Sequence, residues 1–273
     1  MENKPRYVFF GSPEFAAIIL QKLIDAGLPP LTVICNPDRP VGRKKIITPP
    51  PAKLIAKKNN IPVWQPEKLD AEFKSKLANP KLDFTVIAAY SQILKKDVLS
   101  IARLGAIGVH PSLLPKYRGA TPIQNAILNG ETESGITLFL VDEKVDHGPI
   151  LSASKQSLAE KENYQALHDK LAELGAKLLI QTIPDFFTGK IKPQPQDESK
   201  ATLTEKFTTQ DGYVNLQKDN PVMVERKIRA LNPEPGVWTI YNSKRTKLLE
   251  AEITVGQIKL KKIQEAGKNP KTL

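Results

Sequence analysis

Apolar strand patterns alternate with amphipathic helix patterns along much of this chain of 273 residues. An apolar run at residues 7–12 precedes a helix pattern at 12–27, for which Ser12 is the expected cap, and strand patterns follow at 31–36, 82–90 and 105–110. The run at 82–90 is almost wholly apolar, as is typical of a strand covered on both faces of a parallel sheet. The alternation predicts an α/β fold with an open, mostly parallel sheet.

The amino-acid composition and the apolar periodicity of the sequence change near residue 190. Residues 190–204 are rich in proline, glutamine and charge and show no apolar periodicity, which indicates a linker. Short strand patterns separated by turn residues follow it. The predicted organisation is a Rossmann-like domain at 1–189, a linker at 190–204 and a small β-rich domain at 205–273.

The chain is strongly basic, with a formal net charge of +11 and a pI of about 9.5. A basic surface favours a polyanionic partner such as nucleic acid or an anionic membrane. No apolar run reaches the roughly 18 residues of a membrane helix, and the N-terminus lacks the apolar stretch of a signal peptide. We therefore expect a cytoplasmic protein without a membrane span.

Cysteine and histidine usage argues against a metal centre. Cys35 is the only cysteine and lies in an apolar strand pattern, where a small buried hydrophobic residue is the favoured interpretation. No cluster of cysteine and histidine has the spacing of metal ligands, so we expect no metal.

His110 is the first candidate for chemistry. It ends a strand pattern and opens the proline-containing stretch HPSLLPKYRG. Sites in parallel sheets form at the carboxyl ends of strands, and histidine is the usual side chain for proton transfer near neutral pH. Asp146, in the turn VDHGPI, could orient the ring. The residues alone also allow a histidine that only satisfies its loop and an aspartate that only serves an Asx turn. His147 and His168 are interpreted as surface or packing residues.

A long basic connection follows the second strand pattern. Residues 36–53, NPDRPVGRKKIITPPPAK, hold five cations against one acid. A connection of this length in an α/β domain is usually functional or disordered, and its charge suits phosphate contacts. A merely solvated basic loop is the alternative. A dinucleotide site is poorly supported, because the first strand is followed by a lone glycine, Gly11.

The stretches FFGSPEFA, NPDRPVGRKK, VIAAY, HPSLLPKYRGATPIQNAILNGETESGITLFLVDEKVDHGPIL and IRALNPEPGVWT resemble those of methionyl-tRNA formyltransferases. The pattern HPSLLPxYRG with DxGxI marks the wider group that takes a formyl group from 10-formyltetrahydrofolate. The basic loop and RALNPxPGxWT narrow the resemblance to the tRNA enzymes. It covers almost the whole chain.

The resemblance implies roles for individual residues. His110 and Asp146 fall on the catalytic histidine and aspartate, which serve the attack of the methionyl amine on the formyl carbon. The C-terminal domain is expected to be a small, shortened OB-like β-barrel that adds tRNA contacts. Other implied partners are initiator methionyl-tRNA and the folate co-substrate, with no metal, for a monomeric enzyme. The implied folate-binding residues are Ile87, Ala88, Tyr90, Ser112, Leu113, Leu114, Pro115 and Asp142. The implied tRNA-binding residues are Arg39, Arg43, Lys44 and Lys45.

Two departures from the family pattern stand out. Gly108 takes the place of a catalytic asparagine that supplies an oxyanion hydrogen bond, a donor whose loss typically costs about 10²–10³ in rate. Gln124 and Asn125 are conceivable substitutes, and Gly108→Asn is expected to raise the rate if the donor is limiting. The C-terminal stretch is also more compact than usual. Alternatives are a formyltransferase for an amino-sugar nucleotide or another small amine, a formyltetrahydrofolate hydrolase, and a folate- or RNA-binding protein with weakened catalysis.

Overall fold

The computed structural model describes residues 4–42, 44–241 and 243–273. The chain divides into two compact units, which are taken in turn. The first unit comprises Met1–Arg118, Gly135–Gln156 and Asp169–Thr202, and the second comprises Gly119–Ser134, Ser157–His168 and Leu203–Leu273.

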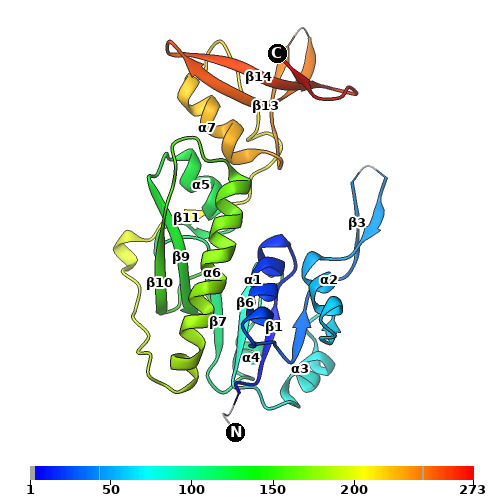
Figure 1. Cartoon of the computed structure of the whole chain (residues 1–273), viewed down its shortest axis with the longest axis vertical. Helices are drawn as coiled ribbons and strands as arrows, with labels where there is room; N and C mark the ends of the chain where they lie inside the picture. Colours follow the sequence, from blue (N-terminus) through cyan, green and yellow to red (C-terminus); the bar gives the residue numbers. More distant parts are fainter. Residues whose placement is uncertain (1–3, 43, 242) are drawn as a thin grey trace. The chain divides into compact units, whose positions relative to one another are not determined.

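A seven-stranded sheet with the order β10-β9-β7-β6-β1-β2-β5 runs through the first unit (Figure 1). The neighbours from β7 to β5 pair in parallel, whereas β9 runs antiparallel to β7. The predicted mostly parallel α/β sheet is therefore confirmed. The strands are β1 (Tyr7–Phe10), β2 (Thr32–Ile34), β5 (Val63–Trp64), β6 (Phe84–Ala88), β7 (Ala106–His110), β9 (Glu133–Leu140) and β10 (Ile150–Ser157).

Helix α1 lies within the helix pattern predicted at residues 12–27, with one difference in capping, and residues 164–168 at the start of α6 belong to the second unit. The helices of this part are α1 (Glu14–Asp25), α2 (Pro51–Lys58), α3 (Ala71–Ala78), α4 (Lys96–Leu99) and α6 (Tyr164–Phe187). Ser12 does not cap α1, because its hydroxyl accepts a hydrogen bond from the Asn36 amide at 2.9 Å. The side chain ties the end of β1 to the end of β2 instead, so the prediction for Ser12 was wrong.

The two faces of the sheet carry different partners. Because side chains alternate along a strand, Val109 lies on one face and Gly108 and His110 lie on the other. Helix α6 covers the Val109 face at Gly175, where an added Cβ would lie 3.2 Å from the Val109 side chain. His110 is therefore presented on the face opposite α6, at the carboxyl end of β7.

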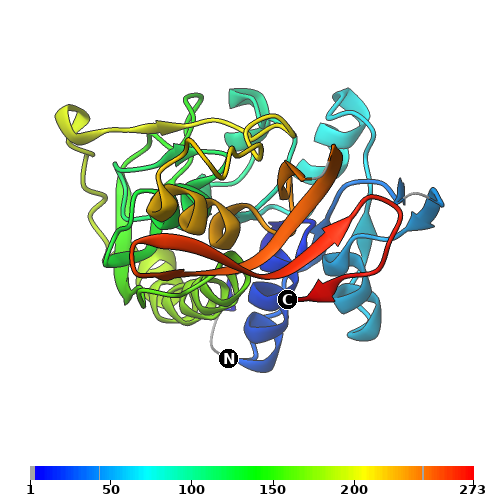
Figure 2. The same ribbon diagram turned by 90° about the horizontal axis from the view of Figure 1, so that it is seen from above.

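The second unit holds α5 (Pro122–Leu128), α7 (Pro221–Leu231) and a four-stranded sheet in the order β12-β13-β14-β15. The neighbours in this sheet are antiparallel, and α7 packs on the sheet (Figure 2). The predicted β-rich C-terminal domain is confirmed in this form. The strands are β12 (Val237–Tyr241), β13 (Lys244–Thr254), β14 (Gln257–Glu265) and β15 (Lys271–Thr272). The remaining short elements of the chain are β3 (Arg39–Val41), β4 (Ile46–Thr48), β8 (Arg118–Gly119), β11 (Leu203–Thr204) and a 3₁₀ turn at Glu198–Lys200.

Candidate active site

The loop after β7 is tied to β9 by hydrogen bonds. Thr137, which is the register partner of His110 on β9, donates through its hydroxyl to the Ser112 carbonyl at 2.7 Å. The same hydroxyl accepts from the Leu114 amide at 3.0 Å. Ser112 Oγ donates to the Lys116 carbonyl at 2.6 Å. Hydrogen bonds within the protein thus hold the loop in its shape, as a preorganised site requires.

His110 is 5% exposed, and its ring lies between Tyr117 and Asp146. Its Nε2 lies 2.8 Å from the Tyr117 carbonyl oxygen. A carbonyl only accepts hydrogen bonds, so Nε2 carries the proton of the neutral ring. Nδ1 lies 3.4 Å from Asp146 Oδ2. The structure thus brings the two predicted catalytic residues together and leaves Nδ1 as the ring nitrogen that can exchange a proton.

Asp146 is presented by a tight turn between β9 and β10. Its φ of 47° lies in the left-handed region, which aspartate tolerates better than most residues. Gly148 lies two residues further on, and a Cβ there would lie 1.7 Å from the Leu140 carbonyl oxygen, so the turn can pack on β9 only with glycine at this position. The close packing of this turn fixes the position of the Asp146 backbone, from which the carboxylate side chain extends.

Gly108 is required by lack of space rather than by its backbone angles. It lies inside β7, in register with Ile87 on one side and Phe139 on the other. A Cβ at this position would lie 2.5 Å from the Phe139 ring and 2.9 Å from Val141. Phe139 is itself buried. The buried ring therefore occupies space that a side chain at position 108 would need, and we expect Gly108→Asn to overpack β7 against β9.

The conceivable substitutes for that donor belong to the second unit. Asn125 Nδ2 donates to the Thr121 carbonyl at 2.8 Å and to the Thr121 hydroxyl at 2.9 Å, at the start of α5. Its amide is thus engaged in its own helix. Gln124 lies beside it in the same helix.

The predicted folate-binding residues lie on several elements of the first unit. Ile87 and Ala88 end β6, in register with Gly108 and Val109. Ser112 and Leu114 are buried in the loop after β7. Leu113 and Pro115 lie in the loop after β7, and Asp142 lies two residues after the end of β9.

Asp142 has hydrogen-bond partners, whereas the Tyr90 hydroxyl has none among the described residues. Asp142 accepts from the Lys144 amide at 2.9 Å and lies 2.6 Å from His147 Nδ1. Tyr90 packs edge-on against Phe10, with the ring centroids 5.3 Å apart. Burial raises the pKa of Tyr90 to about 12, and its buried hydroxyl has no hydrogen-bond partner among the described residues. A buried hydroxyl without a partner is costly, so a polar ligand atom could be accommodated at this point.

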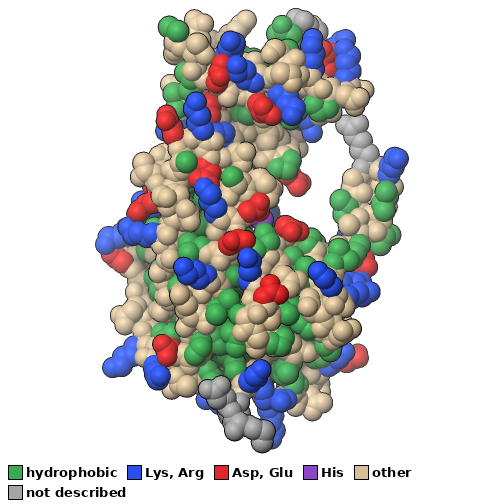
Figure 3. Space-filling view, viewed as in Figure 1, with side chains coloured by type: hydrophobic (Ala, Val, Ile, Leu, Met, Phe, Trp, Pro, Cys, Tyr) green, Lys and Arg blue, Asp and Glu red, His purple; other side chains and the backbone are tan. Residues whose placement is uncertain are grey.

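The predicted basic loop is a β-hairpin of β3 and β4 that extends away from the sheet (Figure 1). Arg39 forms an ion pair with Glu67, and Lys44 and Lys45 are exposed. Arg43 lies outside the described residues. The hairpin also exposes Val41, Ile46 and Ile47, and apolar side chains are visible along it in Figure 3.

Comparison with known protein families shows which family this chain belongs to. The model of the formyl transferase family matches residues 5–183, and that of the formyl transferase C-terminal domain matches residues 206–271. The chain belongs to the formyl transferase family. The resemblance seen in the sequence is confirmed, and both candidate catalytic residues lie within the matched range.

Several relatives of this formyl transferase are methionyl-tRNA formyltransferases. The chain is 41% identical to the methionyl-tRNA formyltransferase of Chloroflexus aurantiacus over 249 residues, and the alignment covers 91% of this chain and 80% of the relative. It is 40% identical over 263 residues to that of Staphylococcus aureus, which covers 96% of this chain and 83% of the relative.

Solved structures share the fold of this formyl transferase. The methionyl-tRNA formyltransferase from Clostridium thermocellum aligns with a TM-score of 0.62 and 18% identity, covering 96% of this chain and 98% of that one. An N-formyltransferase from Helicobacter canadensis, in complex with folinic acid and dTDP-3-aminofucose, aligns with a TM-score of 0.66 and 20% identity, covering 92% and 88%.

Arg118, Gln196 and Glu198 are residues of this site that the sequence did not single out. The Arg118 guanidinium is buried and donates to Gln196 Oε1 and to both carboxylate oxygens of Glu198. Arg118 stands in the quoted motif, but Gln196 and Glu198 lie in the stretch that was predicted to be a linker. Their partners are about 80 residues away in sequence, and no local pattern reports such a contact.

The Arg118–Glu198 pair predicts an acid-sensitive contribution to stability. Hydrogen bonds from Arg118 lower the pKa of Glu198 below its ordinary value of 4.5. A lowered carboxyl pKa stabilises the folded state above the ordinary value, and this contribution is lost as the pH falls through the folded pKa. We expect the difference in unfolding free energy between native protein and Glu198→Gln to be largest above pH 4.5 and to shrink below it. Urea unfolding from pH 3 to 7 measures this, and a difference that does not change with pH would contradict it.

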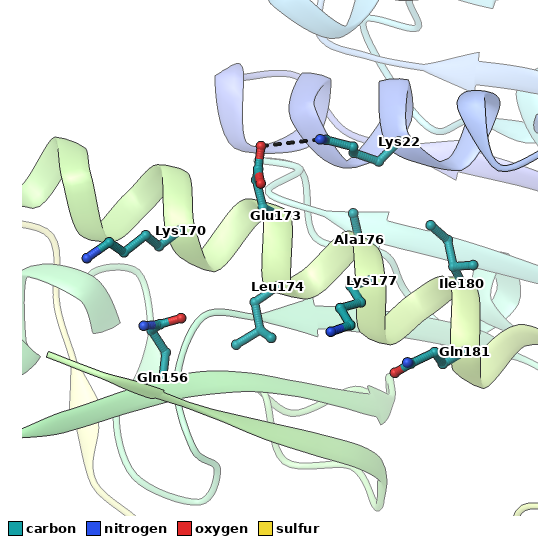
Figure 4. Close-up of a pocket in the computed structure, with 9 residues that line it drawn as sticks. All are labelled: Lys22, Gln156, Lys170, Glu173, Leu174, Ala176, Lys177, Ile180 and Gln181. Carbon is teal, nitrogen blue, oxygen red and sulfur yellow. Dashed lines mark ion pairs between the residues drawn. The ribbon is translucent and has the colours of Figure 1, made fainter.

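A pocket of about 560 Å³ lies elsewhere in the first unit, between α1, α6 and β10 (Figure 4). Its lining includes the Lys22–Glu173 ion pair, with the apolar side chains of Leu174 and Ile180. None of the predicted site residues lines it. No group of three or more histidine, cysteine, aspartate or glutamate residues in the described part of the chain is arranged to hold a metal ion.

Proposed function

We propose that this formyl transferase transfers the formyl group of 10-formyltetrahydrofolate to the amino group of initiator methionyl-tRNA. The observation that supports this most directly is the approach of His110 Nδ1 to Asp146 Oδ2 at 3.4 Å, at the carboxyl end of a parallel strand. The identity of about 40% to methionyl-tRNA formyltransferases over most of the chain favours the tRNA substrate.

In the proposed mechanism His110 handles the proton of the attacking amine. The co-substrate, when bound, supplies the formyl carbon. An amine that becomes an amide must lose a proton, and His110 takes it at Nδ1, because Nε2 is committed to the Tyr117 carbonyl. Asp146 stabilises the positive ring that results and holds its orientation. The proton can then return to the leaving nitrogen from the same ring.

The residues proposed to hold the folate fit a polar heterocycle beside apolar walls. Tyr90 offers a buried hydroxyl without a partner in the described part of the chain, and Ile87 and Leu114 offer apolar surface. The remaining proposed contacts are Ala88, Ser112, Leu113, Pro115 and Asp142. Fluorescence titration of Tyr90→Phe with tetrahydrofolate would report the hydroxyl contact separately from turnover.

A direct assay tests the proposed function. Purified protein is incubated with 10-formyltetrahydrofolate and charged initiator tRNA, and formyl-methionyl-tRNA is followed by acid gel electrophoresis. A parallel reaction offers a dTDP-amino sugar, the substrate of the alternative class. Product on the tRNA supports the proposal. No product on the tRNA above the uncatalysed rate, with or without formylation of the sugar, overturns it.

We expect the hairpin cations to set the salt dependence of tRNA binding. Each cation that contacts a phosphate contributes about one unit to the slope of log K against log salt. Neutralising Arg43, Lys44 and Lys45 together should therefore weaken binding and flatten the slope, as measured by filter binding at several salt concentrations. The exposed cations Lys81, Lys95 and Lys96, neutralised together, provide a control that removes the same number of charges. An unchanged slope in the hairpin variant would show that the hairpin does not contact phosphate.

The proposal also includes the cellular location, the oligomeric state and the domain boundaries. We propose that the protein acts in the cytoplasm as a monomer, with domains at 1–189 and 205–273. Among the helices that the structure describes, none combines the length and apolarity needed to cross a bilayer.

A further inference from the structure

The segment Gln194–Thr202 is hydrogen-bonded to the loop after β7 and to β10. At its start, Gln194 exchanges backbone hydrogen bonds with Ile150 at 2.7 and 2.8 Å. At its end, the Thr202 amide donates to the Pro115 carbonyl at 3.2 Å, and its carbonyl accepts from the Arg118 amide at 2.9 Å. Its hydroxyl accepts from the Tyr117 amide at 2.7 Å. We call this segment the strap.

Gln196, in the middle of the strap, joins the Asp146 turn to Arg118. Its Nε2 donates to the carbonyls of Asp146 at 2.9 Å and Gly148 at 2.7 Å. Its Oε1 accepts from Arg118 Nε at 3.0 Å and Nη2 at 2.7 Å. Gln196 is buried, and these four hydrogen bonds use the full capacity of its amide. A buried amide satisfied in this way accepts only one arrangement of its partners.

These contacts complete a closed circuit around the catalytic pair. His110 Nε2 donates to the Tyr117 carbonyl, and Tyr117 is followed directly by Arg118. Arg118 binds Gln196, and Gln196 binds the backbone of Asp146. The Asp146 carboxylate returns to His110 Nδ1 at 3.4 Å. The separation of ring and carboxylate thus depends on where Gln196 holds the turn.

We propose that Gln196 is a positioning residue that sets the distance between His110 and Asp146 for the reaction. The expected loss of turnover rests on the proposed function, whereas the expected change in geometry around His110 does not. A misplacement of about 1 Å in a catalytic group can cost about 10²-fold in rate. Gln196 lies between the ranges that the two family models match, so its place in the site comes from the hydrogen bonds alone.

Two substitutions at Gln196 test the proposal against a neighbouring control. Gln196→Met keeps the length of the side chain and removes all four hydrogen bonds. Gln196→Glu keeps the acceptor for Arg118 and removes both donors to the turn. The control is Gln194→Met, because the exposed side chain of Gln194 donates only to the Lys192 carbonyl among the described contacts.

The kinetic readout separates positioning from folding. We expect both Gln196 variants to lose about tenfold in kcat, with KM for tRNA and folate changed less than twofold, at a temperature well below each melting midpoint. Gln194→Met should match the native enzyme. Native kcat in the folded Gln196 variants would overturn the proposal. So would failure of both variants to fold, because Gln196 would then be a structural residue only.

A second readout does not need a substrate, so it stands apart from the proposed function. In protein labelled with ¹⁵N-histidine, the His110 signals are assigned by their loss in His110→Gln. We expect the Nδ1 signal to move in both Gln196 variants and to stay in Gln194→Met. Unmoved His110 signals would overturn the positioning role. Failure of the native enzyme to formylate methionyl-tRNA would instead overturn the proposed function and leave this result standing.

Discussion

Turnover of formyl transfer is expected to fall by about 10²–10⁴-fold in Asp146→Asn and in His110→Gln, the range that loss of a general acid–base group produces. Asparagine keeps the size of the side chain but cannot stabilise a positive His110 ring by charge. Glutamine can still donate to the Tyr117 carbonyl, so His110→Gln removes the proton-exchanging Nδ1 while retaining a bond to the loop. Steady-state kinetics with saturating tRNA and folate measure both losses.

His168 provides a matched control for His110. It is also buried, and its ring packs against Tyr164 on α6 at 5.6 Å between centroids. We expect His168→Gln to lower stability while the folded protein retains native turnover. Circular dichroism confirms that each variant is folded at the assay temperature. Turnover within threefold of native in either Asp146→Asn or His110→Gln would remove that residue from the proposed mechanism.

The second large effect is expected at Gly108. Gly108→Asn should lower the free energy of unfolding by about 1–3 kcal/mol, the usual cost of overpacking a core. The reason is the 2.5 Å approach of a Cβ to the Phe139 ring, which must move or force β7 away from β9. We expect no gain in turnover from this single change. Chemical denaturation measures the stability, and the formylation assay measures the turnover.

A double-mutant cycle with Phe139→Ala separates packing from chemistry. Phe139→Ala alone should leave a cavity that costs about 3–5 kcal/mol, and a side chain at position 108 should recover part of it. Gly108→Ala with Phe139→Ala supplies the Cβ without an amide, and Gly108→Asn with Phe139→Ala supplies both. Higher turnover in the second combination alone would show that the amide donor had been limiting. A single Gly108→Asn that is as stable as the native protein would refute the steric argument.

The architecture of the first unit was predictable because its signals are local. The apolar runs around Phe9, Val86 and Ile107 mark strands that are buried in the sheet, and the amphipathic stretches between them mark helices. The pairing of His110 with Asp146 followed from the resemblance, because β9 runs antiparallel to β7 and its carboxyl end pairs with Ile107 rather than His110. Neither inference needed the details of packing.

The parts that were missed depend on contacts between distant residues. Gln196 lies in a stretch without periodicity, and its role appears only when Arg118 and the Asp146 turn come beside it. The Ser12 hydroxyl had two possible partners, and the sequence could not show that the Asn36 amide would take it. Gly108 looked like a lost catalytic group in the sequence, whereas the structure shows the ring that excludes a side chain there.

The contact between Gly108 and Phe139 also restricts how this chain can change by single mutations. A side chain gained at position 108 overpacks the ring, and a ring lost at position 139 leaves a cavity, so each first step lowers stability. Natural proteins lie only a little above the stability that function needs. This chain can therefore gain asparagine at position 108 only through a less stable single variant or through two simultaneous mutations. The contact between β7 and β9 thus limits which single mutations the chain tolerates at these two positions.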